Sequence, residues 1–288
     1  RNTMAYILMT LFSVLFATAT MAQSKQALIF PPDPRLDADK FEVLDTAYLR
    51  IGYALNAEDL TDLSTYIDLQ FLEIGEHLSK YYSAFVVNND SLCTEWMKQP
   101  QIPHGVPFFL GEMGKKTTWS EYQYSEIFRQ GGEQTVYVRM PGSLKRYDSW
   151  YSEPYPLPHW EIGEDTLTIC GYLCQNATCS FRGRDFVAWF APEIPVSQGP
   201  WTFGGLPGLI LKVYDAEKLY TFECISIAEG AFPIKKLDYS SYKQRKRAWI
   251  LKLQRKINED YLQVAPVVDA KTGKRLSHFT PYDPLELE

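Results

Sequence analysis

The sequence predicts an α+β, mainly β fold, in which a curved antiparallel sheet of half-barrel type carries one long basic helix near the C-terminus. The first observation is that apolar residues alternate at period two in short segments that glycine and proline separate, as in half-buried strands. The second is that aromatic residues make up 15% of the 288 residues, with 19 tyrosines. Such richness is typical of sheets in which a ring covers a half-exposed face. The third is a single long helical pattern over 242–260.

The first 22 residues have the features of a signal peptide. Residues 4–22 carry no charge, their centre is almost continuously apolar, and Thr20 and Ala22 place small residues where a signal peptidase cleaves. We therefore expect cleavage before Gln23 and an exported protein, located in the periplasm, in the outer envelope or outside the cell, and peripheral to a membrane at most. The alternative is a retained anchor, because the uncharged stretch just reaches bilayer length.

Composition narrows the classes of partner and cofactor. The chain has 29 basic and 35 acidic residues, a mild acidity that argues against nucleic acid as a partner. Nothing in the sequence indicates a cofactor. No histidine lies beside the clustered cysteines and the cysteine spacing does not match a zinc site, so we predict no metal.

The cysteines predict disulfide bonds, because oxidation is the expected state of an exported protein. An odd count leaves at least one thiol unpaired within the chain, and Cys93 is the candidate because it lies far from the others. The spacing leaves the connectivity open. The candidates for disulfide bonds are Cys170, Cys174, Cys179 and Cys224.

The N-terminal half of the mature chain divides into a lead-in, a run of strands and an irregular region. Three prolines indicate a mobile lead-in over 23–45, followed by one domain over 46–288. Prolines and glycines predict a long loop or insertion over 91–118, with a short helix at 93–98. Strands are predicted at 49–55, 67–71 and 78–87.

The C-terminal half is predicted to resume the sheet and then form the helix. In 177–181 apolar and polar side chains alternate, and Gly183 is placed for a tight turn into a return strand over 184–191. The helix over 242–260 has Ser240 or Ser241 as its N-cap and a stripe formed by Ile250 and residues 253 and 257. Its seven basic residues suit either a solvated face or anionic lipid. The other predicted strands are 135–140, 145–152, 165–170 and the hairpin 209–214 with 219–228.

One uncharged run, Gly199–Leu211 with the sequence GPWTFGGLPGLIL, dictates backbone shape. Leu206 to Leu209 satisfies a type II turn, with proline second and glycine third. We expect a rigid corner that places Trp201 and Phe203 in the core; the alternative is a lip over a ligand cavity. The predicted turn scaffold comprises Gly199, Pro200, Gly205, Leu206, Pro207 and Gly208.

The segments "GYLCQNATCSFRGRDFVAWFAPEIP" and "GPWTFGGLPGLILKVYD" closely resemble the GLPGLI family of exported proteins from Gram-negative bacteria. The likeness extends to "LQFLEIGEHLSKYYS" (69–83) and to the ending Pro284–Leu287, and is least in the lead-in and in 91–118. The resemblance implies a secreted or envelope-associated protein. It implies no activity, cofactor or catalytic residue.

No motif indicates a catalytic site. The four histidines are dispersed without a partner at dyad or metal-ligand spacing. Arg182 and Arg184 share a face if their strand continues, and could clasp a carboxylate or phosphate; alternatively they pair with Glu223 or Asp185. The candidate ligand-binding residues are Arg182, Arg184, Trp189, Trp201 and Phe203.

The sequence therefore favours a non-enzymatic binding or accessory protein of the cell envelope that takes a small apolar ligand or an envelope protein as its partner. One alternative is a secreted hydrolase whose site assembles only in three dimensions, for instance around His159 or His278 with a carboxylate. Another is a structural partner of an outer-membrane complex. We predict no catalytic residues.

Overall fold

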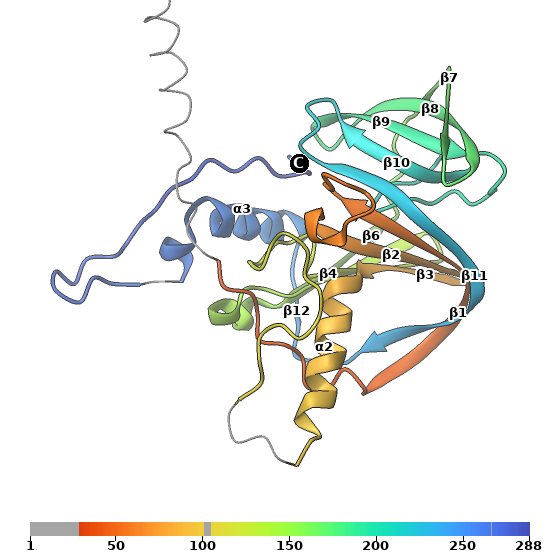
Figure 1. The fold of residues 1–288 in the computed structure, drawn as a ribbon. Helices are drawn as coiled ribbons and strands as arrows, with labels where there is room; N and C mark the ends of the chain where they lie inside the picture. Colours follow the sequence, from red (N-terminus) through yellow and green to blue (C-terminus); the bar gives the residue numbers. More distant parts are fainter. Residues whose placement is uncertain (1–28, 101–104, 266) are drawn as a thin grey trace, which may run out of the picture. The chain divides into compact units, whose positions relative to one another are not determined.

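The protein is built around one twelve-stranded sheet (Figure 1). The computed structural model describes residues 29–100, 105–265 and 267–288, so the predicted signal peptide lies outside the described residues. The strands follow the order β12-β6-β5-β4-β3-β2-β1-β11-β10-β9-β8-β7, and the sheet does not close on itself within the described part of the chain. All neighbours are antiparallel except β12 and β6, so the sheet is mixed. The strands are β1 (Phe41–Leu55), β2 (Asp68–Gly75), β3 (Leu78–Ser83), β4 (Ser125–Gln130), β5 (Glu133–Val138), β6 (Ser149–Pro154), β7 (Glu161–Ile169), β8 (Tyr172–Phe181), β9 (Arg184–Ala191), β10 (Leu209–Asp215), β11 (Thr221–Leu237) and β12 (Lys243–Gln244).

The described chain divides into two parts. Residues 29–255 with 283–288 hold the whole sheet, and Lys256–Tyr282 form the other part. Within this second part the Ser277 hydroxyl and the His278 backbone N–H both donate to the Asp260 carboxylate. None of the helices described in residues 29–100, 105–265 and 267–288 is both long and apolar enough to cross a bilayer.

Two long strands, β1 and β11, pair in the middle of the sheet and join its halves. Leu49, Ile51 and Tyr53 of β1 are buried, which agrees with the alternation in the sequence. The pattern in β2 is reversed, because Leu69 and Phe71 are only half-buried while Asp68 and the other residues in phase with it are buried. The strand was predicted, but its more buried face carries Asp68 and Gln70 together with the apolar Leu72 and Ile74.

The segment over 91–118 begins inside a helix. Ser83 ends β3 and caps α2 (Ala84–Met97), accepting a hydrogen bond from the Val86 backbone N–H at 3.1 Å. The predicted strand 78–87 therefore stops at Ser83, and the helix expected only at 93–98 is a full 14 residues long. Cys93 is buried in this helix rather than in irregular chain.

The lead-in reaches the sheet earlier than the sequence pattern indicates, because β1 starts at Phe41 rather than at Leu49. The described part of the lead-in is hydrogen-bonded to α2: the Arg35 backbone N–H donates to the Asp90 carboxylate at 2.8 Å, and that of Ala38 donates to the Thr94 hydroxyl at 3.1 Å.

The last helix, α3 (Arg247–Val264), starts five residues later than predicted. Lys243 and Gln244 pair with Ser149 and Trp150 of β6 as a parallel strand, so their backbone is extended, and neither Ser240 nor Ser241 caps the helix. Of the predicted apolar stripe, Ile250 is fully buried. Three of the seven basic residues precede the helix, which weakens the case for a lipid-binding face.

Candidate functional site

The two predicted ligand-binding arginines flank a tight turn between β8 and β9. Arg182 and Gly183 both have positive φ, 48° and 82°, as two-residue hairpin turns require. The strand therefore does not continue through Arg182, and the expected shared strand face is absent. A Cβ on Gly183 would lie 2.8 Å from the Leu287 Cβ, so glycine also permits the C-terminal residues to approach.

Arg182 binds the carboxylate of Glu286, which is buried. Arg182 Nη1 lies 2.7 Å from Glu286 Oε2, Arg247 contacts the same oxygen, and the Trp201 indole N–H donates to Oε1 at 2.8 Å. Burial alone would raise the pKa of Glu286, but the two guanidiniums hold it below its ordinary value. We call this arrangement of Arg182, Arg247, Trp201 and Glu286 the C-terminal clasp.

Arg184 binds the same segment. Its guanidinium contacts the Asp283 carboxylate and donates to the Pro284 carbonyl at 2.9 Å from Nε. Neither arginine pairs with Glu223 or Asp185, the partners that the sequence suggested. Both are held in ion pairs within the chain. For the partners near the C-terminus, the only signal in the sequence is its acidic ending.

The remaining predicted ligand-binding residues do not converge on one open cavity. Trp201 is 7% exposed and packs edge-on against Tyr122, with ring centroids 5.3 Å apart. Phe203 is buried against Phe186, with ring centroids 4.8 Å apart. Trp189 is half-buried in the middle of β9. The structure thus brings Arg182 and Trp201 together at Glu286 and places Phe203 in the core.

The glycine-proline run forms a corner, as expected, but with a different glycine in the left-handed region. Gly205 has φ 89°, whereas Gly208 has no positive φ, so the predicted type II turn over 206–209 is wrong. Glycine is needed at 208 because a Cβ there would overlap the Ala191 carbonyl oxygen. At Gly199 a Cβ would lie 2.8 Å from the Ile210 Cβ. Pro200 accepts a turn hydrogen bond from Phe203, and Leu206 is buried.

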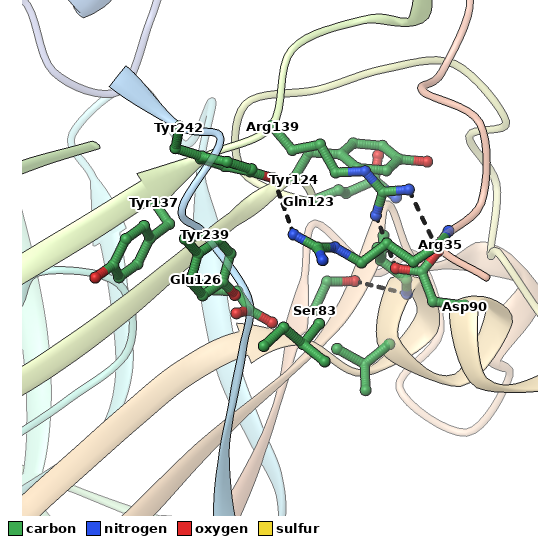
Figure 2. Close-up of a pocket in the computed structure, with 13 residues that line it drawn as sticks. Arg35, Ser83, Asp90, Gln123, Tyr124, Glu126, Tyr137, Arg139, Tyr239 and Tyr242 are labelled. Atoms are coloured by element: carbon green, nitrogen blue, oxygen red, sulfur yellow. Dashed lines mark hydrogen bonds and ion pairs between the residues drawn. The ribbon is translucent and has the colours of Figure 1, made fainter. Parts of the chain in front are cut away.

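A cleft that the sequence did not reveal lies on the other half of the sheet, where the segment after β11 crosses β5 (Figure 2). The Tyr137 ring of β5 stacks on Tyr239, with centroids 4.0 Å apart and planes within 15°. Tyr242 meets Tyr239 edge-on at 5.0 Å, and Trp150 of β6 lies 6.3 Å from Tyr137. We call Tyr137, Trp150, Tyr239 and Tyr242 the aromatic cluster.

Charged side chains adjoin the aromatic cluster. The Arg35 guanidinium lies 5.3 Å from the Tyr239 ring and donates to the Tyr242 hydroxyl at 3.3 Å, while Arg139 pairs with Asp90 at 2.7 Å (Figure 2). The arginines, Asp90 and the two tyrosines come from four segments that are far apart in the sequence. Arg35 belongs to the lead-in, which explains why no local pattern pointed to it.

The cleft has an inner cavity and two open grooves. The cavity, of about 30 Å³, has room for a single water molecule and is lined by Glu126, Tyr137 and Tyr239. One groove of about 600 Å³ shares Tyr137 and Tyr239 with the cavity. The other, of about 520 Å³, shares Arg35 and Arg139 and reaches Asp148, whose burial raises its pKa to about 6.

Three polar atoms of the residues that line the cavity lack a hydrogen-bond partner among the described residues: Gln123 Oε1, Glu126 Oε2 and the Tyr239 hydroxyl. Neither the buried Tyr239 hydroxyl nor Glu126 Oε2 has a hydrogen bond to any described residue, although Glu126 Oε1 lies 3.4 Å from Lys80 Nζ. A buried polar group without a partner is costly unless water or a ligand satisfies it. The arrangement can therefore bind a molecule with an apolar face and a hydrogen-bonding edge.

Neither histidine of the hydrolase alternative forms a dyad in the described parts of the chain. His159 is exposed beside a groove of about 440 Å³ that Ser180 and Asp185 also line, but the Ser180 hydroxyl donates to Asp185 and the imidazole has no hydrogen bond. His278 meets Asp260 through its backbone N–H at 3.1 Å, not through its ring.

None of the four cysteines predicted to form disulfide bonds does so in the structure. All five cysteines are free thiols. Within residues 29–100, 105–265 and 267–288, no group of three or more His, Cys, Asp or Glu side chains is arranged to hold a metal ion.

Residues 182–212 match a family described as "Protein of unknown function (Porph_ging)". The match covers the return strand β9 and the glycine-proline corner. No curated protein matches the sequence. Two solved structures of PNGF-II, in two crystal forms, are similar at 14% identity with a TM-score of 0.46, over 75% of this chain and 34% of that one. This chain thus spans about a third of the length of PNGF-II, and its residues 182–212 are similar to a family without a described function.

Proposed function

We propose that this is an exported, non-enzymatic binding protein that takes a small ligand in the cleft beside the aromatic cluster. The observation that carries the proposal is the unpartnered Tyr239 hydroxyl, buried beside a cavity and stacked on the half-exposed ring of Tyr137. Ligand sites typically combine apolar and aromatic walls with a few polar groups that fix orientation. The ligand would place an apolar face on the rings and a hydrogen-bonding edge at Tyr239 and Glu126.

We also propose that the protein is exported to the periplasm, the outer envelope or the outside of the cell. The support for export is the uncharged N-terminal segment with small residues at the cleavage point. The likeness of the sequence to GLPGLI proteins agrees with an envelope location.

A curved, half-barrel-like sheet is the scaffold that we infer for this function. Its support is the position of Cys170, in the turn between β7 and β8. The Cys170 Sγ lies 3.2 Å from the Cys224 carbonyl oxygen of β11, although two strands separate β8 from β11 in the sheet order. A flat sheet would hold strands so far apart in the order at about 14 Å.

The test is titration of the purified protein with 1-anilinonaphthalene-8-sulfonate, a fluorescent probe with fused apolar rings and an anionic edge. We expect saturable binding that Trp150→Ala weakens at least tenfold, because Trp150 lines the open groove. Trp189→Ala is the matched control, since that tryptophan is also half-buried but lies in β9. Fluorescence that never saturates, or equal losses in both variants, would refute binding at this cleft.

A further inference from the structure

Two cysteines meet where the turn between β7 and β8 reaches β11. Cys170 is the first residue of that turn, with φ 50°, and is exposed. Cys224 is buried in β11, and Cys174 is buried in β8. Cys170 and Cys224 are 54 positions apart in the sequence, so no local spacing connects them.

The Cys170 side chain lies against Cys224, since its Sγ is 3.2 Å from the Cys224 carbonyl oxygen. Interaction with the Cys224 side chain lowers the pKa of Cys170 to about 7, although burial opposes the change. The same interaction, together with burial, raises the pKa of Cys224. One thiol of the pair is therefore exposed and readily ionised, which is the state that attacks a disulfide.

The other three cysteines are less suited to start the reaction as the attacking thiolate. Burial raises the pKa of Cys174 to about 11 and that of Cys179 to about 12, so both stay protonated at neutral pH. Cys93 lies in α2, where burial also raises its pKa.

We propose that Cys170 and Cys224 form a disulfide bond that links the turn between β7 and β8 to strand β11. The oxidant is a disulfide compound such as oxidised glutathione. The Cys170 thiolate attacks one of its sulfurs, forming a mixed disulfide and releasing one glutathione thiolate. Cys224 then gives its proton to the released thiolate, and its own thiolate attacks the Cys170 Sγ and expels the second glutathione. The two cysteines lose two electrons and two protons, and one oxidised glutathione becomes two thiols.

The position of this bond would stabilise the sheet against opening. It closes a loop that contains β8, β9 and β10, and a crosslink over a loop of this length restricts the unfolded chain strongly. In oxidising surroundings, where disulfide bonds persist, it would hold the turn between β7 and β8 against β11. Both cysteines lie apart from the ligand cleft, which is beyond β1 on the other half of the sheet.

The direct test is peptide mapping of the native full-length protein after incubation with oxidised glutathione. Remaining thiols are blocked with iodoacetamide, and the protein is digested without reductant. We expect a crosslinked peptide pair joining Cys170 to Cys224, with Cys93, Cys174 and Cys179 alkylated. Five alkylated cysteines, a stable glutathione adduct on Cys170, or a Cys170–Cys174 link would each overturn the proposal.

A second measurement tests whether the disulfide bond itself stabilises the protein. Reduction with dithiothreitol should lower the melting temperature of the oxidised protein by about 5–10 °C. In Cys170→Ser, which changes an exposed residue, dithiothreitol should no longer lower the melting temperature. In Cys179→Ala, which removes a buried thiol of β8, it should still do so. A response that survives in Cys170→Ser, or that is absent in the oxidised protein, would contradict the proposed pair.

Discussion

The carboxylate of Glu286 is held 2.7 Å from the guanidinium of Arg182, across 104 positions of sequence. Both side chains are largely withdrawn from water, at 8% and 11% exposure. The bond fastens the C-terminal residues to the turn between β8 and β9, the start of the segment that the family match covers. Arg182, which the sequence suggested as a ligand-binding residue, therefore has a structural role in the clasp.

Removing one partner of the clasp should destabilise the protein strongly. Arg182→Ala leaves the buried Glu286 carboxylate with one guanidinium fewer, and breaking a buried pair in this way costs about 3 kcal/mol. Urea unfolding followed by tryptophan fluorescence would measure the loss. Lys98→Ala is the control, because Lys98 is exposed to solvent in its pairs with Asp39 and Glu95, and its loss should change stability much less. Equal effects of the two substitutions would contradict the clasp.

Asp68 should make the folded protein less stable as the pH rises. Burial raises its pKa to about 8, and its carboxyl group is enclosed with Ser83 and Gln70. A carboxyl whose folded pKa is raised binds its proton more tightly in the native state, so stability falls between the unfolded value near 4 and about pH 8. The slope reaches at most about 1.4 kcal/mol per pH unit.

Asp68→Asn removes this titration while keeping the shape of the side chain. Urea unfolding at several pH values should show a flatter profile for the variant between pH 5 and 8, with the largest relative gain at the alkaline end. A parallel pair of profiles would mean that Asp68 does not titrate in this range.

Two glycines should respond to alanine for different reasons. Gly208→Ala forces a Cβ onto the Ala191 carbonyl, which the packed corner cannot relieve, and we expect a loss of about 2–3 kcal/mol. Gly171→Ala meets nothing within 4 Å but has φ 81°, so only backbone strain of about 1 kcal/mol is expected. Chemical unfolding of both variants distinguishes steric overlap from strain, and a larger loss at Gly171 would contradict the close approach at Gly208.

Tyr239→Phe should separate stability from binding. The substitution removes a buried hydroxyl that has no partner among the described residues, so the unliganded protein should gain about 1 kcal/mol in urea unfolding. The ring stacking on Tyr137 is kept. Affinity for a ligand that hydrogen-bonds to this hydroxyl should fall in isothermal titration. A loss of stability would show that the hydroxyl is satisfied in the native protein.

Local sequence patterns predicted the strands and turns whose structure is decided by residues close to one another in the sequence. The alternation in β1, the turn at Gly183 and the hairpin across 215–218 were correctly identified, because side-chain period and turn chemistry decide them. β4 was missed because Glu126 and Arg129 interrupt its apolar pattern, although both find partners in the fold.

The sites depend on partners that sequence order does not reveal. Helix α3 starts later than predicted because Lys243 and Gln244 pair with β6 as a strand. Strand pairing in the folded protein thus overrides the helical propensity of these residues. Arg182 was predicted to bind a ligand, yet in the structure it pairs with Glu286, near the C-terminus of the same chain. The aromatic cluster draws on β5, β6 and the segment after β11, so only the fold brings its rings together.

Strand β11 is shared by both halves of the sheet: its first residues pair with β10, and the strand pairs along nearly its whole length with β1. Neither half can separate while this ladder is intact, so loosening on one side must be transmitted to the other through the backbone amides of β11. Those amides should therefore exchange with deuterium among the slowest in the molecule, at the rate of global rather than local opening.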